Sequence, residues 1–359
     1  MVPIPPDAFL GVANHSVGAF FAANCYAPQK LIRRWSWETY WMTQAAWCWL
    51  LWPIVGAILT IPQLGAVLAE APKPCMVIAF LMGIAYGIGG TAFNISIRYI
   101  GFSLTYAIAV GLSSILGTLV PPTIKGEIGA VFAKPGAEMI VLGILAGALG
   151  ITVCGAAGRL KEIDLQSSEG GAGGFSLLKG LGLSLLAGIL SAVYGIATDH
   201  VAEPVVVIAR QHNAGIWEGN IRYLLVNPGA FVTALAIGLY LARKNRSLGE
   251  LVAVKNGNRN DPGRLSLNYL LAMLTGTLWY GQFFFYNLGH VRMGSFKFTS
   301  WAIHMTMLVL FSILVGLVFR EWKGCRARTL VTVVAGLGLL TAAVALLTYG
   351  NYLGDIHGT

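Results

Sequence analysis

Residues 328–349 read RTLVTVVAGLGLLTAAVALLTY, and this run decides the structural class of the chain. It carries no charge after its first residue, and it is as long as the roughly 20 residues that a helix needs to cross the hydrocarbon core of a bilayer. A transmembrane barrel is excluded, because barrel strands alternate in polarity whereas this run is continuously apolar. The run therefore predicts a membrane-spanning helix.

The composition extends this prediction to the whole chain. Of its 359 residues, 56% are hydrophobic and 11% are charged, and the mean hydropathy is +0.69. Soluble domains carry about 25% charged residues. These values exclude a soluble enzyme, a nucleic-acid-binding domain and a disordered protein. They indicate a polytopic helical membrane protein whose surroundings are the lipid bilayer.

Ten apolar runs can be read along the chain, and turn or charge signals separate them. Pro53 lies inside the second run and predicts a kink in that helix. We expect membrane-spanning helices at about 8–28, 39–61, 75–99, 102–122, 137–157, 177–199, 221–242, 266–289, 296–318 and 328–349.

The basic residues predict the orientation of these helices. The formal net charge is +9, and 17 Lys and Arg residues fall on the odd-numbered connections against 7 on the even-numbered ones. Cytoplasmic loops are enriched in Lys and Arg. We therefore expect a multi-pass protein of the cell inner membrane with both termini on the periplasmic side. Residues 1–7 lack the basic segment of a secretory signal, so the first run is expected to be retained.

A Gly- and Ser-rich tract divides the chain into two halves. It belongs to a predicted flexible linker, 158–176, which separates a first half, 8–157, from a second half, 177–349. Each half has five apolar runs. Homologous halves with an odd number of spans must insert with opposite orientations, as in many secondary transporters. The expected fold is an all-α integral membrane protein of ten transmembrane helices, arranged as two inverted five-helix repeats.

Few titratable residues lie deep in the apolar runs. His15 and His304 each lie about eight residues, or roughly 12 Å, inside a run. Asp199 lies at the end of the sixth run. Intramembrane ionisable groups tend to face a partner or a cavity, and histidine titrates near neutral pH. We expect His304, His15 and Asp199 to bind a coupling proton; the alternative is that the histidines are neutral and hydrogen-bonded within the core.

Aromatic and amide side chains recur on helix faces in the same region. Trp279, Gln282 and Tyr286 are spaced i, i+3, i+7 and share one face, and Trp301 lies three residues before His304. Aromatic rings beside amide groups suit a small polyol, although Trp and Tyr also form belts at membrane interfaces. The residues that we expect to bind substrate are Trp279, Tyr280, Gln282, Tyr286, Asn94, Tyr86, Trp301 and Asn24.

Several motifs of other protein classes are missing from the sequence. It has no HExxH, GxSxG or GxxxxGK[ST] motif, and its five cysteines lack the spacing of metal ligands. We therefore expect no enzyme activity, no metal and no cofactor other than the proton. A transport step would take its energy from an ion gradient or from the gradient of the solute.

Motifs along nearly the whole chain closely resemble those of the L-rhamnose–proton symporters, a family of the drug/metabolite transporter superfamily. They include WSWET at 35–39, WYGQFFFY at 279–286, Gly289-His290, SWAIHM at 300–305 and Glu321-Trp322. The resemblance implies ten spans in two five-helix repeats. It also implies proton-driven uptake of a six-carbon deoxy sugar across the inner membrane.

The function predicted from the sequence is the import of L-rhamnose or a closely related deoxy sugar by a proton symporter that works by alternating access. Two alternatives stay open at this point. One is an exporter of drugs or metabolites with the same fold. The other is a membrane sensor that binds sugar without moving it.

Overall fold

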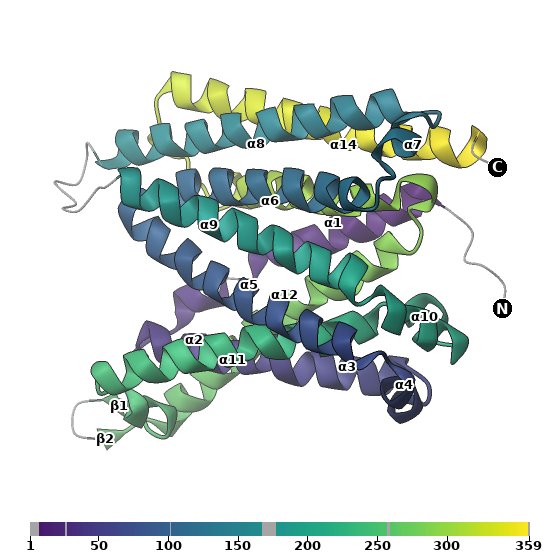
Figure 1. Ribbon diagram of the computed structural model, residues 1–359. Coiled ribbons are helices and arrows are strands. Elements are labelled where there is room, and N and C mark those ends of the chain that lie inside the picture. Colours follow the sequence, from purple (N-terminus) through teal and green to yellow (C-terminus); the bar gives the residue numbers. More distant parts are fainter. Residues whose placement is uncertain (1–6, 26, 101, 167–176, 257–258, 358–359) are drawn as a thin grey trace. The chain divides into compact units, whose positions relative to one another are not determined.

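A computed structural model describes residues 7–25, 27–100, 102–166, 177–256 and 259–357 of the chain (Figure 1). It is almost entirely helical and contains two compact units, one formed by Met1–Ala23, Gly89–Ile196 and Phe285–Thr359 and the other by Asn24–Ile88 and Ala197–Phe284. We call these unit 1 and unit 2. Each draws helices from both halves of the sequence. The two units are defined by contacts within the structure, whereas the predicted repeats 8–157 and 177–349 are defined by an internal symmetry that these contacts do not test. The division into repeats therefore stays a prediction.

Eight helical segments in the described part of the chain are long and apolar enough to cross a membrane. They are Trp37–Thr60, Lys73–Ser96, Thr105–Ile124, Ala137–Leu165, Leu178–Gln211, Gly215–Lys244, Phe296–Val318 and Ala327–Ile356. Helices also occupy the two remaining predicted positions, α1 (Ala8–Asn24) and α12 (Pro262–His290). The first has only 17 residues, and the second is interrupted by polar side chains. These two helices carry six of the predicted site residues.

Unit 1 contains the helices at the two ends of the chain and most of those in its first half. They are α1 up to Ala23, the end of α5 (Lys73–Ile100), α6 (Phe102–Ile124), α7 (Ile128–Phe132), α8 (Ala137–Gln166), α9 (Leu177–Ile196), the end of α12, the short helix η6 (Gly294–Thr299), α13 (Ser300–Val318) and α14 (Ala327–His357). Since α8 continues to Gln166, the first part of the predicted linker is helical; residues 167–176 lie outside the described residues.

Helices α8 and α14 lie side by side over most of their length (Figure 1). Leu340 and Leu347 of α14 are fully buried and lie seven residues apart. They cover Gly150 and Gly143 of α8, where a Cβ atom would lie 2.8 and 2.7 Å from the leucine side chains. Large residues on one helix therefore fill the space that glycines leave on the other, which allows close packing without interhelical hydrogen bonds.

Unit 2 contains the remaining helices and a small hairpin. Its elements are η1 (Pro28–Leu31), α2 (Trp37–Ala45), the π-helix η2 (Ala46–Leu51), α3 (Trp52–Thr60), α4 (Leu64–Glu70), the start of α5, the π-helix η3 (Ala197–Val201), α10 (Glu203–Gln211), η4 (Gly215–Trp217), α11 (Asn220–Lys244), η5 (Leu248–Leu251), β1 (Lys255–Asn256), β2 (Arg259–Asn260) and the start of α12. The strands are antiparallel, with Lys255 opposite Asn260 and Asn256 opposite Arg259.

Both π-helices precede a proline at the start of the next helix. Pro53 follows η2 and Pro204 follows η3. A proline has no N–H, and its ring clashes with the carbonyl group four residues before it. The wider π turn makes room for that ring; for example, the N–H of Ala202 donates to the carbonyl of Ala197, five residues earlier, at 3.0 Å. The predicted distortion at Pro53 is thus a π turn, and the second one presents Asp199.

The WSWET motif at 35–39 anchors the connection between α11 and α12. The carboxylate of Glu250 accepts hydrogen bonds from the N–H of Ser36 at 2.6 Å and from the hydroxyl of Thr39 at 2.9 Å. The indole of Trp35 donates to the carbonyl of Glu250 at 2.9 Å. A negative charge at the start of α2 also suits the helix dipole. This part of the motif therefore has a structural role.

Candidate functional site

Four predicted site residues converge in unit 1. The ring of Tyr286, on α12, lies 5.1 Å from the ring of His15 on α1 and 5.4 Å from the ring of His304 on α13, measured between centroids. The two imidazole centroids are 6.2 Å apart. The ring of Trp301 lies 5.8 Å from that of Tyr286, in an edge-on arrangement. All four side chains are at least 97% buried, so three helices enclose a compact polar and aromatic cluster.

Hydrogen bonds and two glycines hold Trp301 in place. Its indole N–H lies 3.1 Å from the carbonyl oxygen and 3.2 Å from the hydroxyl of Ser113, on α6. A Cβ at Gly117 would lie 2.5 Å from the indole, and a Cβ at Gly195 would lie 3.2 Å from it. Trp301 is therefore a buried, oriented side chain of unit 1 and does not belong to an interfacial belt.

The imidazole of His15 lies in an unusual environment. The side chain is completely buried, and neither ring nitrogen has a hydrogen-bond partner among the described residues. Buried polar atoms are almost always hydrogen-bonded, and a buried donor or acceptor without a partner costs about 1–3 kcal/mol. Its neighbours are Tyr286 and His304 together with the backbone of Gly289, where a Cβ would lie 2.9 Å from the ring. His15 is thus placed to bond to a polar ligand or a proton.

A second aromatic cluster lies in unit 2 and contains Trp279 and Tyr86. The ring of Trp279 lies 5.3 Å from Trp49 and 6.3 Å from Tyr86, and Trp49 in turn packs edge-on against Trp41 at 5.6 Å. The indole nitrogens of Trp41 and Trp49 are buried and have no hydrogen-bond partner among the described residues. Trp41 and Trp49 were not among the predicted site residues; Trp41, near the start of its predicted span, fits an interfacial belt equally well.

The other predicted substrate residues have different surroundings. Tyr280 is buried against Tyr223, and its hydroxyl oxygen lies 2.2 Å from where a Cβ of Gly56 would be. Asn94 donates from its amide to the carbonyl of Gly90, one turn earlier in its own helix, at 2.9 Å. Gln282 is buried in unit 2, and Asn24 is half-buried at the end of α1. Of the eleven predicted site residues, unit 1 contains His15, Asn94, Tyr286, Trp301 and His304, and unit 2 contains the others.

Asp199 belongs to a network of charges in unit 2. Its carboxylate lies 3.5 Å from the guanidinium of Arg222, which also binds Glu203 at 2.8 Å. Beside them, Arg210 binds both carboxylate oxygens of Glu218 at 2.6 Å. The side chain of Arg222 is 1% exposed. The network therefore contains three carboxylates and two guanidinium groups, one of them fully buried.

Comparison with known proteins assigns the chain to a family. A family model described as L-rhamnose-proton symport protein matches residues 6–352. The L-rhamnose-proton symporter of Pectobacterium atrosepticum is 31% identical over 345 residues, which cover 95% of this chain and 97% of the relative. Those of Cronobacter sakazakii and Mannheimia succiniciproducens are each 32% identical over 348 residues, which cover 92% of this chain and 98% of the relative.

The chain belongs to the L-rhamnose-proton symport protein family. The resemblance seen in the sequence motifs is thereby confirmed. A member of this symport family is a transport protein and not an enzyme, and its apolar helices make it a multi-pass membrane protein. Among the residues that the structure describes in this symport-family chain, no group of three or more His, Cys, Asp or Glu side chains is arranged to hold a metal ion.

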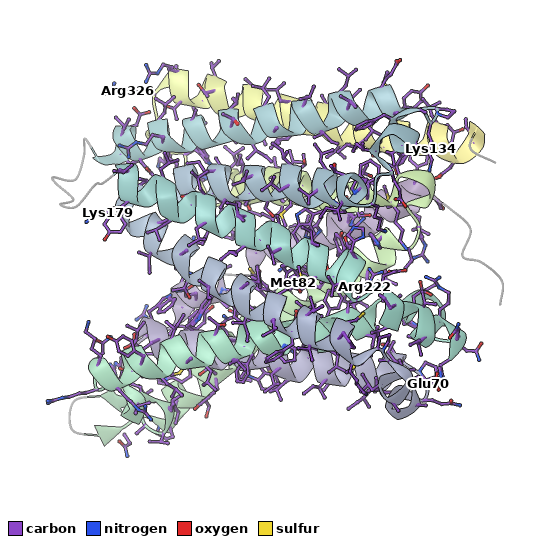
Figure 2. All side chains as sticks on the ribbon, viewed as in Figure 1. Glu70, Met82, Lys134, Lys179, Arg222 and Arg326 are labelled. Atoms are coloured by element: carbon purple, nitrogen blue, oxygen red, sulfur yellow. The ribbon has the colours of Figure 1, made fainter. Side chains whose placement is uncertain are left out.

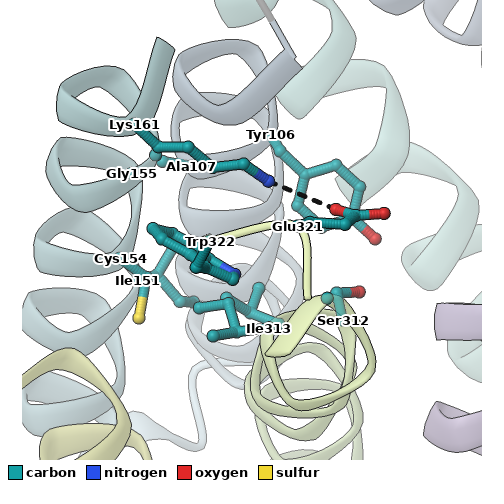
Figure 3. Close-up of a pocket in the computed structure, with 13 residues that line it drawn as sticks. Tyr106, Ala107, Ile151, Cys154, Gly155, Lys161, Ser312, Ile313, Glu321 and Trp322 are labelled. Atoms are coloured by element: carbon teal, nitrogen blue, oxygen red, sulfur yellow. Dashed lines mark hydrogen bonds and ion pairs between the residues drawn. The ribbon is translucent and has the colours of Figure 1, made fainter. Parts of the chain in front are cut away.

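This symport-family chain also has a cavity in unit 1 that none of the predicted residues lines (Figure 3). Its volume is about 100 Å³, and its walls come from α6, α8, α13 and the segment after α13. The ammonium of Lys161 binds the carboxylate of Glu321 at 3.2 Å and lies 4.8 Å from the ring centre of Trp322. One cation and one carboxylate thus neutralise each other at this cavity.

Glu203 and Arg222 are the residues of this symport-family chain that the sequence analysis missed. Arg222 was counted with the charges of a connection, whereas it lies in the first turn of α11 and is buried. One signal was available: residues 199–222 hold five Asp, Glu and Arg residues in a chain that is only 11% charged. Such a concentration beside two apolar runs indicates charges that pair with one another.

Proposed function

We propose that this protein imports L-rhamnose or a closely related deoxy sugar together with a proton. The observation that carries the proposal is its membership of the L-rhamnose-proton symport protein family over residues 6–352. Curated relatives that align over more than nine-tenths of the chain are named L-rhamnose-proton symporters. The buried polar and aromatic clusters of the two units supply the chemical groups that such an activity needs.

Recognition of the sugar is assigned to the aromatic and amide side chains. A deoxy sugar has apolar C–H faces, which stack on aromatic rings, and hydroxyl groups, which bond to amides and imidazoles. In this proposal Trp301, Tyr286 and Asn94 contribute from unit 1. Trp279, Tyr280, Gln282, Tyr86 and Asn24 contribute from unit 2. The oriented indole of Trp301 supports its role, because its hydrogen bonds to Ser113 fix the plane on which a ring would stack.

The coupling proton is assigned to His304, with His15 or Asp199 as its partner. The close approach of the two imidazoles supports a shared proton, since both cannot be charged at low cost when they lie 6.2 Å apart in a buried cluster. A membrane potential of 100 mV supplies about 2.3 kcal/mol per charge. At about 1.4 kcal/mol per tenfold, one proton could concentrate a neutral sugar roughly 40-fold.

The transport cycle is proposed to be alternating access in the cell inner membrane. Ten spans in two inverted five-helix repeats, with both termini on the periplasmic side, would rock about a central binding site. Loading of both sugar and proton would permit the inward turn, with no metal and no cofactor besides the proton. The bias of 17 against 7 basic residues supports the orientation.

The test is uptake of labelled sugar by the purified protein in proteoliposomes with an imposed inward pH gradient. We expect L-rhamnose, offered in parallel with L-fucose and L-lyxose, to accumulate above equilibrium and to lose this accumulation when a protonophore is added. Equilibration without accumulation would contradict proton coupling. Resistance of expressing cells to lipophilic cations without sugar uptake would favour an exporter, and sugar binding without counterflow would favour a sensor.

A further inference from the structure

Three buried polar atoms in unit 2 have no hydrogen-bond partner among the residues that the structure describes. They are the indole nitrogens of Trp41 and Trp49 and the amide oxygen of Gln44, on α2 and η2. These side chains are 3%, 2% and 1% exposed, respectively. Buried polar groups in proteins are almost always hydrogen-bonded. Two donors and one acceptor that need partners therefore lie along one stretch of helix, and a bound molecule can supply those partners.

The π turn of η2 brings Trp49 next to Trp41. The two residues are eight positions apart, and because an α-helix turns about 100° per residue, their side chains would lie roughly 80° apart around a regular helix. A π turn takes in one extra residue, which reduces this angle to roughly 20°. The two rings accordingly lie 5.6 Å apart, between centroids, in an edge-on arrangement. Gln44 follows Trp41 by three positions and is its neighbour on the helix surface. The distortion of the helix thus gathers the three polar groups.

Aromatic rings from α2, α5 and α12 surround the two indoles. Trp37 stacks on Trp41 at 5.2 Å, with an angle of 15° between the ring planes. Trp279, on α12, and Tyr86, on α5, lie 5.3 and 6.2 Å from Trp49. Such rings offer flat apolar faces on which the C–H groups of a sugar stack. The cluster therefore combines stacking surfaces with hydrogen-bonding groups that need partners.

The cluster lies away from a buried charge of unit 2. Ala230 and Ala234 of α11 pack against the tryptophans. Arg222, a buried cation of unit 2 (Figure 2), is in the first turn of that helix, eight and twelve residues earlier, or roughly 12 and 18 Å away along the axis. The tryptophan, tyrosine and glutamine side chains of the cluster carry no charge at neutral pH. These surroundings favour a neutral ligand over an ion.

We propose that Trp41, Gln44 and Trp49 bind hydroxyl groups of the transported sugar. The inference rests on the proposed function and adds three residues to its binding site. A hydroxyl group both accepts and donates, so a sugar with several hydroxyls accepts from the two indole N–H groups and donates to the amide oxygen of Gln44. An apolar molecule or a lipophilic ammonium ion offers no acceptor for these N–H groups. The arrangement therefore selects a neutral polyol.

The substitution that tests this site most cleanly is Gln44→Met, which removes the amide but keeps an unbranched side chain of similar size. Trp41→Phe and Trp49→Phe remove the indole N–H and keep an aromatic ring. Binding of labelled L-rhamnose to the purified full chain is measured in detergent, so the result does not depend on proton coupling. We expect each variant to bind the sugar about tenfold more weakly, which corresponds to about 1.4 kcal/mol.

Trp52→Phe is the matched control. Trp52 lies three residues after Trp49, but its indole N–H donates to the hydroxyl of Thr277, at 3.0 Å. This variant should bind L-rhamnose with unchanged affinity and should melt at a lower temperature, because it loses a hydrogen bond within the protein. Measured without sugar, Gln44→Met should melt at no lower temperature than the unchanged protein, since its amide oxygen has no bond to lose among the described residues.

Analogues of L-rhamnose that each lack one hydroxyl group separate sugar binding from a structural role. Gln44→Met removes the partner of one hydroxyl, so its affinity for the analogue that lacks this hydroxyl should equal that of the unchanged protein within twofold. The other analogues should bind about tenfold more weakly to the variant. Groups that contact each other show such non-additive effects, whereas the effects of independent sites add.

Three results would overturn the inference. One is an affinity for L-rhamnose within twofold of the unchanged protein in Gln44→Met, Trp41→Phe and Trp49→Phe. Another is an equal loss of affinity for L-rhamnose and for every analogue, which would indicate a structural role. The third is a Gln44→Met protein that does not fold, because the amide would then be bonded within the protein. Failure of the unchanged protein to bind L-rhamnose would instead overturn the proposed function, and the inference with it.

Discussion

Replacing Trp301 by phenylalanine removes the indole N–H but keeps an aromatic ring at the centre of the unit 1 cluster. The N–H lies 3.1 Å from the carbonyl oxygen and 3.2 Å from the hydroxyl of Ser113, and it links α13 to α6. That hydroxyl in turn donates to Ser191, on α9, at 2.9 Å. The substitution therefore releases a side chain that is held from two neighbouring helices, without removing its stacking surface.

The expected size of the effect follows from these contacts. Both acceptors belong to Ser113, so they count as one shared hydrogen bond, whose net worth is about 1–1.5 kcal/mol in a buried site. If the bond orients the indole for the sugar, its loss weakens sugar binding by about the same amount. Since about 1.4 kcal/mol corresponds to a factor of ten, we expect Trp301→Phe to weaken the apparent affinity for L-rhamnose roughly tenfold.

The assay is counterflow of labelled L-rhamnose at varied sugar concentration in proteoliposomes. Trp322→Phe is the control, because Trp322 is also a buried tryptophan of unit 1 but lies beside Lys161 at the separate cavity. We expect the control to retain its affinity, and thermal unfolding in detergent to show whether both variants are folded. An affinity unchanged within twofold in folded Trp301→Phe would refute the role of the oriented indole.

Three further substitutions test the account. His304→Ala should abolish uphill uptake while sparing counterflow, and continued accumulation with proton entry would assign the proton elsewhere. Gly117→Val should weaken the affinity for sugar, because a Cβ at position 117 would lie 2.5 Å from the indole of Trp301. Gly129→Val should leave the affinity unchanged, because a Cβ at position 129 would have no atom within 4 Å. Equal affinities of the two variants would argue against the packing effect. Glu250→Ala should lower the free energy of unfolding by about 1–2 kcal/mol, because it removes the carboxylate that accepts hydrogen bonds from the N–H of Ser36 and the hydroxyl of Thr39; an unchanged melting temperature would contradict this.

Composition and hydrophobic runs were sufficient to predict the class of the protein and the position of each long helix. The helices differ from the predicted runs mainly at their ends; for example, α8 continues to Gln166 and the helical segment that begins at Leu178 continues to Gln211. Hydropathy cannot locate these ends, since helices extend beyond the bilayer wherever their polar residues find partners. The all-helical membrane architecture follows from backbone hydrogen bonding in lipid, which leaves a chain few alternatives.

The candidate site was only partly predictable. Helical spacing placed Trp301 and His304 on one face, but their contact with Tyr286, on another helix, depends on packing that no local pattern encodes. Arg222 was missed for a related reason. A hydropathy average counts the charge of an arginine but not its partners, and the ion pairs of Arg222 with Asp199 and Glu203 are what allow it to be buried.

The central claim is that sugar and proton enter together. It is tested most directly by adding L-rhamnose to one side of a membrane that contains the purified protein, with no pH gradient and no membrane potential imposed. We predict an electrical current of positive charge in the direction of sugar movement, together with alkalinisation of the side to which the sugar was added. Sugar movement without current and without a change in pH would contradict the account.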